Sequence, residues 1–210
     1  MKDYTQALIP ESTYHVYNHA VSTDNLFRSD ENYRFFLKKY AHYIAPVADT
    51  FAYCLLPNHF HFALRIKNES ELAVYFESIG KRWDKNRPEF QALAALVSLQ
   101  FSHMFNSYTQ SFNKKFNRKG TLFRKPFRRL LIDSDSYFRD VIHYIHYNSV
   151  HHGFTDDFRS WKYSSFESFF SDKSSLLNRD EVIEWFHDKD NFYACHQREI
   201  DDELCFELET

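Results

Sequence analysis

Residues 50–66 read TFAYCLLPNHFHFALRI. The two halves, 50–56 and 59–66, are rich in aromatic and aliphatic residues of the kind that favours strands. Pro57-Asn58 between them is a typical turn sequence. We therefore predict two strands joined into an antiparallel hairpin, because antiparallel strands need only a short connection.

The segments around this hairpin alternate between strand and helix patterns. One helix begins at Ser29 or Asp30 and carries an apolar stripe, and another begins at Ser134 and ends before Gly153. The further elements are strands at 14–18 and 127–133 and helices at 30–44, 70–80, 91–111 and 134–148. This order predicts an α+β fold, with one antiparallel sheet and helices on one of its faces.

Glycine is scarce in this chain of 210 residues, which has only Gly80, Gly120 and Gly153. These three cannot form either of the glycine-rich loops that cradle phosphates in nucleotide-binding proteins. Aromatic residues are abundant instead, at 19% of the chain. Collagen-like and disordered classes are therefore excluded, and any phosphate chemistry must depend on other residues.

The cysteines indicate a reducing compartment. Cys54, Cys195 and Cys205 are odd in number and far apart, so they form no C-x-x-C pair and no disulfide framework. No run of 18 apolar residues is present, and the N-terminus lacks the pattern of a signal peptide. We therefore expect a cytoplasmic protein with no membrane partner.

Charge is distributed unevenly along the chain. The formal net charge of −3 would by itself argue against nucleic acid as a partner. Between residues 113 and 130, however, eight basic residues occur with no acid among them: Lys114, Lys115, Arg118, Lys119, Arg124, Lys125, Arg128 and Arg129. From residue 180 to 210, 11 acids occur with only two basic residues. The small net charge is the sum of a basic middle and an acidic C-terminal segment.

The first candidate for chemistry is the pair His59 and His61. On a strand, residues two apart point to the same side, so the two imidazoles lie together and Phe60 points to the other side. Neighbouring neutral imidazoles can form half of a divalent-cation site. The alternative is a pair of exposed or hydrogen-bonded histidines, since the chain has 12 histidines and a chance pair is plausible.

The second candidate is the pair Tyr144 and Asn148. On a helix, residues four apart share a face, so the phenol and the amide can reach the same point. Tyrosine is a possible nucleophile, and the amide oxygen suits Mg²⁺ or Mn²⁺. Alternatively, Tyr144 is a core aromatic residue and Asn148 caps the end of the helix.

The third candidate is the basic stretch, in which Phe112, Phe116, Phe123 and Phe127 alternate with lysines and arginines. Cations contact phosphates, and aromatic faces stack on unpaired bases. Eight uncompensated charges repel one another unless an anionic partner binds them, which favours nucleic-acid binding. The alternative is a solvated loop with its phenylalanines in the core.

Together these features resemble the single-tyrosine HUH transposases, of the REP-associated tyrosine transposase kind. The His-bulky-His segment of that family follows a Pro-Asn or similar turn, as at 57–61 here. Its basic segment is similar to residues 113–123, and its tyrosine helix to residues 144–153, which read YIHYNSVHHG. The WKYSS sequence at 161–165 also matches, so the resemblance covers about residues 14–165 in the order of the family.

The resemblance implies a fold and a domain organisation. The fold is a ferredoxin-like core with a four- to five-stranded antiparallel sheet and helices on one face, followed by a C-terminal helical extension. Residues 1–165 would form the HUH transposase catalytic domain, and residues 166–210 an acidic C-terminal extension.

It also implies a mechanism. Tyr144 would be the catalytic nucleophile, and His59, His61 and Asn148 would bind one Mg²⁺ or Mn²⁺. Such an enzyme nicks and rejoins single-stranded or hairpin-containing DNA through a 5′-phosphotyrosine, with the basic stretch bound to the DNA backbone. The resemblance leaves open whether the protein is a monomer or a homodimer.

Two positions depart from the family pattern. Ser149 replaces the usual proline, and His151-His152 replaces a different usual pair, but neither change removes an expected ligand or the tyrosine. The departure at Ser149 and the acidic tail favour an alternative, a catalytically inactive nucleic-acid-binding protein that retains the fold. A metal hydrolase unrelated to DNA ranks last, because it leaves the basic stretch without a role.

Overall fold

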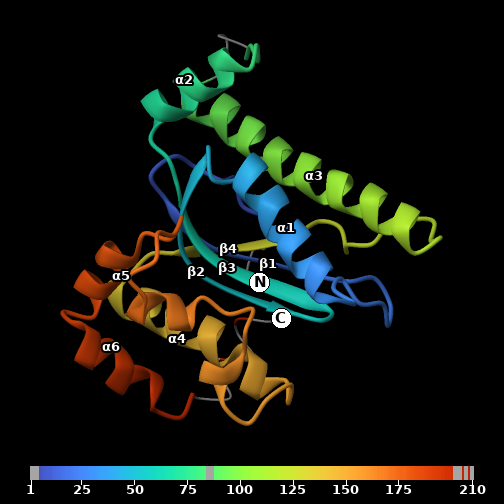
Figure 1. Cartoon of the computed structure of the whole chain (residues 1–210). Helices are drawn as coiled ribbons and strands as arrows, with labels where there is room; N and C mark the ends of the chain where they lie inside the picture. The colour runs from blue at the N-terminus through green and yellow to red at the C-terminus, as the bar shows by residue number, and fades with distance from the viewer. Residues whose placement is uncertain (1–4, 84–87, 201–204, 206–207, 209–210) are drawn as a thin grey trace.

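A four-stranded antiparallel sheet forms the centre of the molecule (Figure 1). The computed structural model describes residues 5–83, 88–200, 205 and 208. Within them the strands are β1 (Thr13–His19), β2 (Ala48–Leu56), β3 (His59–Ile66) and β4 (Arg128–Ile132), in the sheet order β2-β3-β1-β4. The predicted α+β fold with an antiparallel sheet is confirmed. Of the four to five strands expected, the described residues form four.

The connections give the sheet a ferredoxin-like topology. Helix α1 (Asp30–Tyr43) connects β1 to β2, and α2 (Glu69–Ser78) and α3 (Glu89–Lys115) connect β3 to β4. Strand β1 lies between β3 and β4 and pairs with both in antiparallel register. This is the split arrangement in which the first strand enters the middle of the sheet.

One face of the sheet packs against α1 and α3. Strand β3 contributes Phe60, Phe62, Leu64 and Ile66, which alternate along the strand and are all buried in the first of two apolar clusters. Figure 1 shows α1 and α3 together on this side. Many of the phenylalanines and tyrosines of the chain lie in this cluster, so the aromatic excess largely builds the core.

The other face is also covered, so the expectation of helices on one face is wrong. Helix α4 (Asp135–His151) packs on β2 and β3, and α5 (Arg179–Trp185) and α6 (Lys189–His196) lie on the same side (Figure 1). The second apolar cluster fills this interface. In sequence, β3 alternates histidines with apolar residues, a pattern typical of a strand with one face in water. In the structure, however, His59 and His61 are as buried as their apolar neighbours.

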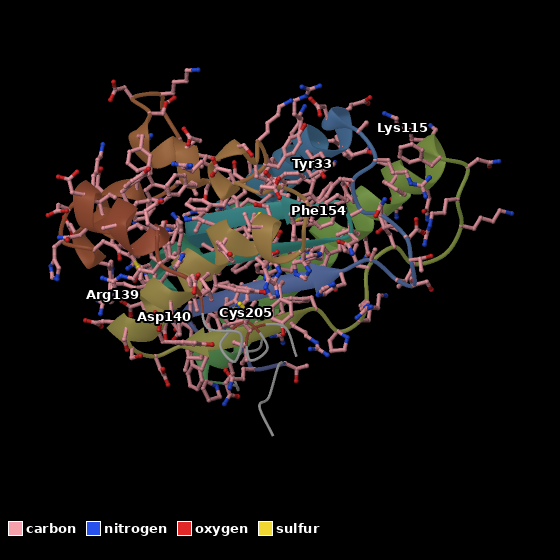
Figure 2. The ribbon with its side chains drawn as sticks, turned by 90° about the horizontal axis from the view of Figure 1, so that it is seen from below. Tyr33, Lys115, Arg139, Asp140, Phe154 and Cys205 are labelled. Atoms are coloured by element: carbon pink, nitrogen blue, oxygen red, sulfur yellow. The ribbon has the colours of Figure 1, made fainter. Side chains whose placement is uncertain are left out.

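The chain beyond Ser165 forms 3-10 and α helices that pack beside α4. These are the 3-10 helix Phe166–Phe170, then α5 and α6, and they contribute Phe166, Phe169 and Phe192 to the second cluster. Cys205 and Leu208 are buried in the same cluster, and Cys205 is labelled in Figure 2. Parts of the acidic segment, 201–204, 206–207 and 209–210, lie outside the described residues. The division at residue 165 stays a prediction.

The longest described helix is α3, with 27 residues. Neither α3 nor any other helix in the described part of the chain combines the length and apolarity that a membrane span requires.

Candidate active site

The two histidines of the hairpin lie on the same face of β3. The ring centroids of His59 and His61 are 5.2 Å apart, the rings are nearly perpendicular, and both side chains are buried. Phe60 between them belongs to the cluster on the opposite face. The sheet therefore holds the two imidazoles side by side, because alternate residues of a strand share a face.

Helix α4 places two further residues against this pair. Tyr144 and Asn148 lie one turn apart, so they share a helix face. The ring of Tyr144 is edge-on to that of His61, with centroids 5.4 Å apart. Oδ1 of Asn148 lies 3.0 Å from Nε2 of His59. The structure thus brings together all four residues predicted for the catalytic and metal-binding set.

The hydrogen bonds of His59 fit a cation site. Its Nδ1 lies 2.7 Å from Oδ1 of Asn58, and in the tautomer in which this nitrogen donates, Nε2 bears a lone pair. That lone pair faces the amide oxygen of Asn148 at 3.0 Å. Adjacent ligands of an octahedral Mg²⁺ are about 3 Å apart, because each lies about 2.1 Å from the ion. Turning the amide over would let Nδ2 donate instead, so the pair is also stable without a cation.

His61 has a nitrogen suited to the same role. Its Nδ1 lies 2.8 Å from Nε2 of His15, and its own Nε2 is buried with no hydrogen-bond partner among the described residues. Buried polar atoms without a partner are rare in folded proteins, and a bound water or ion is one explanation for them. Burial, together with the neighbouring imidazoles of His15 and His59, holds the pKa of His61 well below 6.5. The ring is therefore neutral, the form that binds a metal.

The ligand set depends on Asn148. No group of three or more histidine, cysteine, aspartate or glutamate side chains in the described part of the chain is arranged to hold a metal ion. The donors that fit are two imidazole nitrogens and one amide oxygen, a set that suits Mg²⁺ or Mn²⁺ when water fills the remaining positions.

Two histidines of β1 extend this group. The ring of His19 stacks on that of His59 with centroids 4.7 Å apart, and His15 contacts His61 as described above. We call His15, His19, His59 and His61 the sheet cluster. The sequence prediction missed His15 and His19. Their even spacing within one strand was the available signal, but the register that pairs His19 with His59 comes from the fold.

Tyr144 is completely buried in this conformation. It belongs to the second apolar cluster, which also contains Leu56, Ala63, Cys205 and Leu208. A reactant can therefore reach the phenol only after some of the cover over Tyr144 moves.

A second group of histidines lies on the opposite side of α4. Nδ1 of His146 is 2.8 Å from Nε2 of His196 on α6, and Nε2 of His146 is 2.8 Å from Oγ of Ser165. All three side chains are buried. We call His146, Ser165 and His196 the helix cluster, and sequence reasoning did not identify it because its members are up to 50 residues apart.

The hydrogens of the helix cluster follow from its ends. The amide of Tyr53 donates to Oγ of Ser165, so the hydroxyl donates to Nε2 of His146. Nδ1 of His146 then carries a proton and donates to Nε2 of His196, whose Nδ1 donates to the carbonyl of Phe192. Every ring nitrogen of His146 and His196 therefore takes part in a hydrogen bond, and both rings are neutral.

Burial controls the pKa values around the helix cluster. It lowers the pKa of His196 to about 3, against a usual 6.5, although the hydrogen bond to the Phe192 carbonyl acts in the opposite direction. Burial and the nearby charge of Arg198 lower the pKa of His143 to about 4. Protonation of these rings is therefore coupled to opening of the second apolar cluster.

The basic stretch is partly compensated, contrary to the sequence interpretation. Arg118 pairs with Asp24 at 2.6 Å and bonds three backbone carbonyls, and Lys115 pairs with Glu31. Arg129 donates to backbone carbonyls near the N-terminus. The two acids, Asp24 and Glu31, come from a distant part of the sequence.

Figure 2 shows where the basic stretch begins. Lys115 lies at the end of α3, far from Arg139 and Asp140 on α4.

The other basic residues differ in their surroundings. Arg128 is half-buried on β4. Lys114, Lys119, Arg124 and Lys125 are exposed and make no ion pair with any described residue. These four charges are the part of the stretch that remains available to an anionic partner.

The aromatic residues of the stretch do not form a stacking surface. Phe112, Phe123 and Phe127 are buried in the first apolar cluster. Phe116 is half-buried, and the guanidinium of Arg28 lies 4.9 Å from its ring centroid. The alternative interpretation of these phenylalanines as core residues therefore holds.

Comparison with known proteins gives one sequence relative and one solved structure to report. No family model matches the chain. A Haemophilus influenzae protein that carries the name of a REP-associated tyrosine transposase is 27% identical over 122 residues, which cover 56% of this chain. The match spans 58% of that relative, so the chain matches little more than half of its length.

The structural comparison agrees with the sequence comparison. The structure of a REP-associated tyrosine transposase bound to a REP hairpin superposes with a TM-score of 0.56 and 13% identity. The match covers 85% of this chain and 94% of the other. At this sequence identity it shows that the two folds are similar. In sequence and in fold, the chain is similar to the REP-associated tyrosine transposases of the HUH family.

Proposed function

We propose that this protein is a metal-dependent transposase that nicks and rejoins single-stranded, hairpin-containing DNA through a 5′-phosphotyrosine on Tyr144. One observation carries the proposal. The phenol of Tyr144 lies edge-on to the neutral imidazole of His61, whose Nε2 has no partner among the described residues, and the amide of Asn148 lies 3.0 Å from Nε2 of His59. Similarity to the REP-associated tyrosine transposases supports the same conclusion.

The reaction needs one bond formed and one broken at phosphorus. Oη of Tyr144 bonds to the phosphorus, and the bond from phosphorus to the 3′-oxygen breaks to release a 3′-hydroxyl. A free tyrosine has a pKa of about 10, so its proton must leave as the new bond forms. Covalent capture conserves the phosphodiester bond energy, so a 3′-hydroxyl can later attack the phosphotyrosine and rejoin a strand.

His59, His61 and Asn148 would hold Mg²⁺ or Mn²⁺ beside the phenol. When bound, such an ion polarises the scissile phosphate and stabilises the charge that develops on it. The hydrogen bond from His59 to Asn58 fixes the orientation of one imidazole, and contact with His15 fixes the other. The residues thus bind the cation and align Tyr144 for attack.

We propose DNA as the partner because four exposed cations of the basic stretch make no ion pair with described residues. Lys114, Lys119, Arg124 and Lys125 would contact phosphates. Arg118 and Arg129 would instead keep their chain segments in place through the bonds that they already make.

One observation favours a second function. Tyr144 has no exposed surface, and a buried tyrosine is what a catalytically inactive DNA-binding protein of this fold would retain as a core residue. That protein would bind hairpin DNA and never form a covalent adduct.

The test is adduct formation with a labelled oligonucleotide that contains a hairpin and a single-stranded flank. We expect the wild-type chain with Mn²⁺ to give a covalent species that survives denaturing electrophoresis. Tyr144→Phe should abolish it and keep DNA binding. Tyr147→Phe is the matched control, because Tyr147 is a half-buried tyrosine of the same helix that lies outside the Tyr144–Asn148 face.

Each result has a definite meaning. Loss of the adduct on chelation or in His59→Ala supports the metal assignment. An adduct of wild-type yield from Tyr144→Phe contradicts the nucleophile assignment. Hairpin binding without any adduct from the wild-type chain favours the inactive DNA-binding protein.

A further inference from the structure

Arg128 differs from the other cations of the basic stretch in its place in the fold. It is half-buried and is the first residue of β4. The next residue, Arg129, donates to backbone carbonyls near the N-terminus. Successive residues of a strand point to opposite faces, so Arg128 and Arg129 lie on different sides of the sheet.

The strand register places Arg128 on the face of the candidate active site. Arg128 pairs with Tyr17 of β1, and Tyr17 pairs on its other side with His61 of β3. Directly paired residues of antiparallel strands point to the same side of the sheet. Leu130, two residues beyond Arg128, is buried in the second apolar cluster, which lies on this face. Arg128, Tyr17 and His61 therefore form a row across three strands.

This row is short enough for its two ends to bind one ligand. Neighbouring strands lie about 4.8 Å apart, so the backbones of Arg128 and His61 are about 10 Å apart. The ring of Tyr17 lies between them and stacks on that of His61, with centroids 5.4 Å apart. The stem of an arginine has three methylene groups and spans much of this distance. A phosphate beside His61 is therefore within reach of the Arg128 guanidinium.

The charges on this face of the sheet are separated into two groups. Asp49 and Arg65 pair at the end of the sheet away from His61, with 3.5 Å between Oδ2 and Nη2, and Arg65 also pairs with Glu181. At the end that carries His61, the described strands supply Arg128 and no acid. An anion that binds there meets an arginine beside the neutral ring of His61.

We propose that Arg128 is a catalytic residue that binds the scissile phosphate and stabilises the charge on its non-bridging oxygens during attack by Tyr144. The inference rests on the proposed function, and it separates Arg128 from the cations that contact phosphates elsewhere on the DNA. A guanidinium can donate two parallel hydrogen bonds to two oxygens of one phosphate, which gives the contact a defined geometry.

The step balances without a proton from Arg128. Oη of Tyr144 bonds to phosphorus and its proton passes to water, while the bond from phosphorus to the 3′-oxygen breaks and that oxygen takes up a proton from water. The guanidinium stays protonated throughout, as arginine does in proteins. Its contribution is electrostatic, because its donors are in place where negative charge develops.

The first test measures the rate of adduct formation by the full-length chain at saturating protein with Mn²⁺. Two hairpin oligonucleotides differ only at the scissile linkage, which is a phosphodiester in one and a methylphosphonate in the other. The methyl group replaces one non-bridging oxygen and removes the negative charge. We expect Arg128→Ala to slow the reaction of the phosphodiester about a hundredfold and to react with the methylphosphonate at nearly the wild-type rate.

The second test measures binding of the same two oligonucleotides without divalent metal. The wild-type chain should bind the phosphodiester more tightly than the methylphosphonate, and Arg128→Ala should bind both equally. Arg128→Lys should recover part of the rate and part of this preference, because lysine keeps the charge and loses the fork of donors. Arg34→Ala is the matched control, because Arg34 is an exposed arginine of α1, which covers the other face of the sheet.

Thermal melting shows whether each variant is folded. A loss in Arg128→Ala that is equal for the two linkages, in rate and in binding, would mean that Arg128 has only a structural role. Adduct formation by Arg128→Ala at the wild-type rate would also overturn the assignment, and both results leave the proposed function intact. Failure of the wild-type chain to form any adduct would instead overturn the proposed function, and the catalytic role of Arg128 with it.

Discussion

The sheet cluster and the helix cluster lie on the two sides of α4, and both contain buried histidines whose pKa burial lowers, His61 in the first and His146 and His196 in the second. In the helix cluster each ring nitrogen has a hydrogen-bond partner, and the hydrogens run in one direction from Tyr53 to Phe192. In the sheet cluster Nε2 of His61 has no partner among the described residues, and the lone pair of His59 faces an amide oxygen. Burial and histidine content therefore do not distinguish the two clusters, whereas the Nε2 of His61, which has no partner among the described residues, does.

The largest effect should come from deleting a ring of the helix cluster. His146→Ala removes a side chain with two hydrogen bonds, opens a cavity, and leaves Ser165 and His196 unpaired. We expect the free energy of unfolding in urea to fall by about 3–5 kcal/mol. His61→Ala should cost less, because one nitrogen of His61 makes no bond. The exposed His42→Ala is the control. Equal losses in the two buried variants would contradict the comparison.

Metal should stabilise the protein through the sheet cluster alone. At a free Mn²⁺ concentration one hundred times its dissociation constant, we expect about 2.7 kcal/mol of added stability. Calorimetric melting with and without MnCl₂ measures the shift, and excess chelator should remove it. His61→Ala and Asn148→Ala should abolish the shift, and His196→Gln should retain it. A shift that disappears in His196→Gln and persists in His61→Ala would show that the metal binds in the helix cluster and not in the sheet cluster.

Acid should destabilise the protein through its buried neutral histidines, among them His61 of the sheet cluster and His196 of the helix cluster. His196 has a folded pKa of about 3 and an unfolded pKa near 6.5, so the unfolded chain binds more protons as pH falls below 6.5. Stability is therefore full above pH 6.5 and is lost on acidification, by about 2 kcal/mol between pH 7 and pH 5 for this group. Urea unfolding at several pH values should show a shallower pH dependence in His196→Gln. An unchanged dependence would mean that other groups carry the acid response.

The smallest effect should come from the start of α4, away from both clusters. The hydroxyl of Ser134 accepts from the amide of Tyr137 at the first turn, whereas Ser29 at the start of α1 makes no such bond. We expect Ser134→Ala to lower the free energy of unfolding by about 1 kcal/mol and Ser29→Ala by less. Both variants should bind Mn²⁺ as the wild type does. A weaker Mn²⁺ shift in Ser134→Ala would show that metal binding depends on the whole helix.

Local structure was predictable from the sequence because its signals are local. Strand β3 occupies the predicted residues 59–66, and α4 begins after Ser134 as its capping sequence indicates. The same spacing rules brought His59, His61, Tyr144 and Asn148 into consideration, and the fold places them together.

Contacts between distant segments could not be predicted in this way. Asp24 and Glu31 neutralise parts of the basic stretch from about 90 residues away, so the stretch had seemed uncompensated. His196 reaches His146 across 50 residues, and no periodicity indicates such a pair. The covered second face was missed because buried histidines have the same pattern in sequence as solvated ones.

The position of β1 in the middle of the sheet has a consequence for how the chain folds. β1 is made first, but its partners β3 and β4 end at residues 66 and 132. During synthesis the strand that carries His15 and His19 must wait for more than a hundred residues before both of its edges are paired. Such non-local pairing slows folding, because the long loop must close before its contacts form. Until then an edge of β1 presents unpaired backbone N–H and C=O groups that can pair with other chains, so yield during expression should depend on temperature and protein concentration.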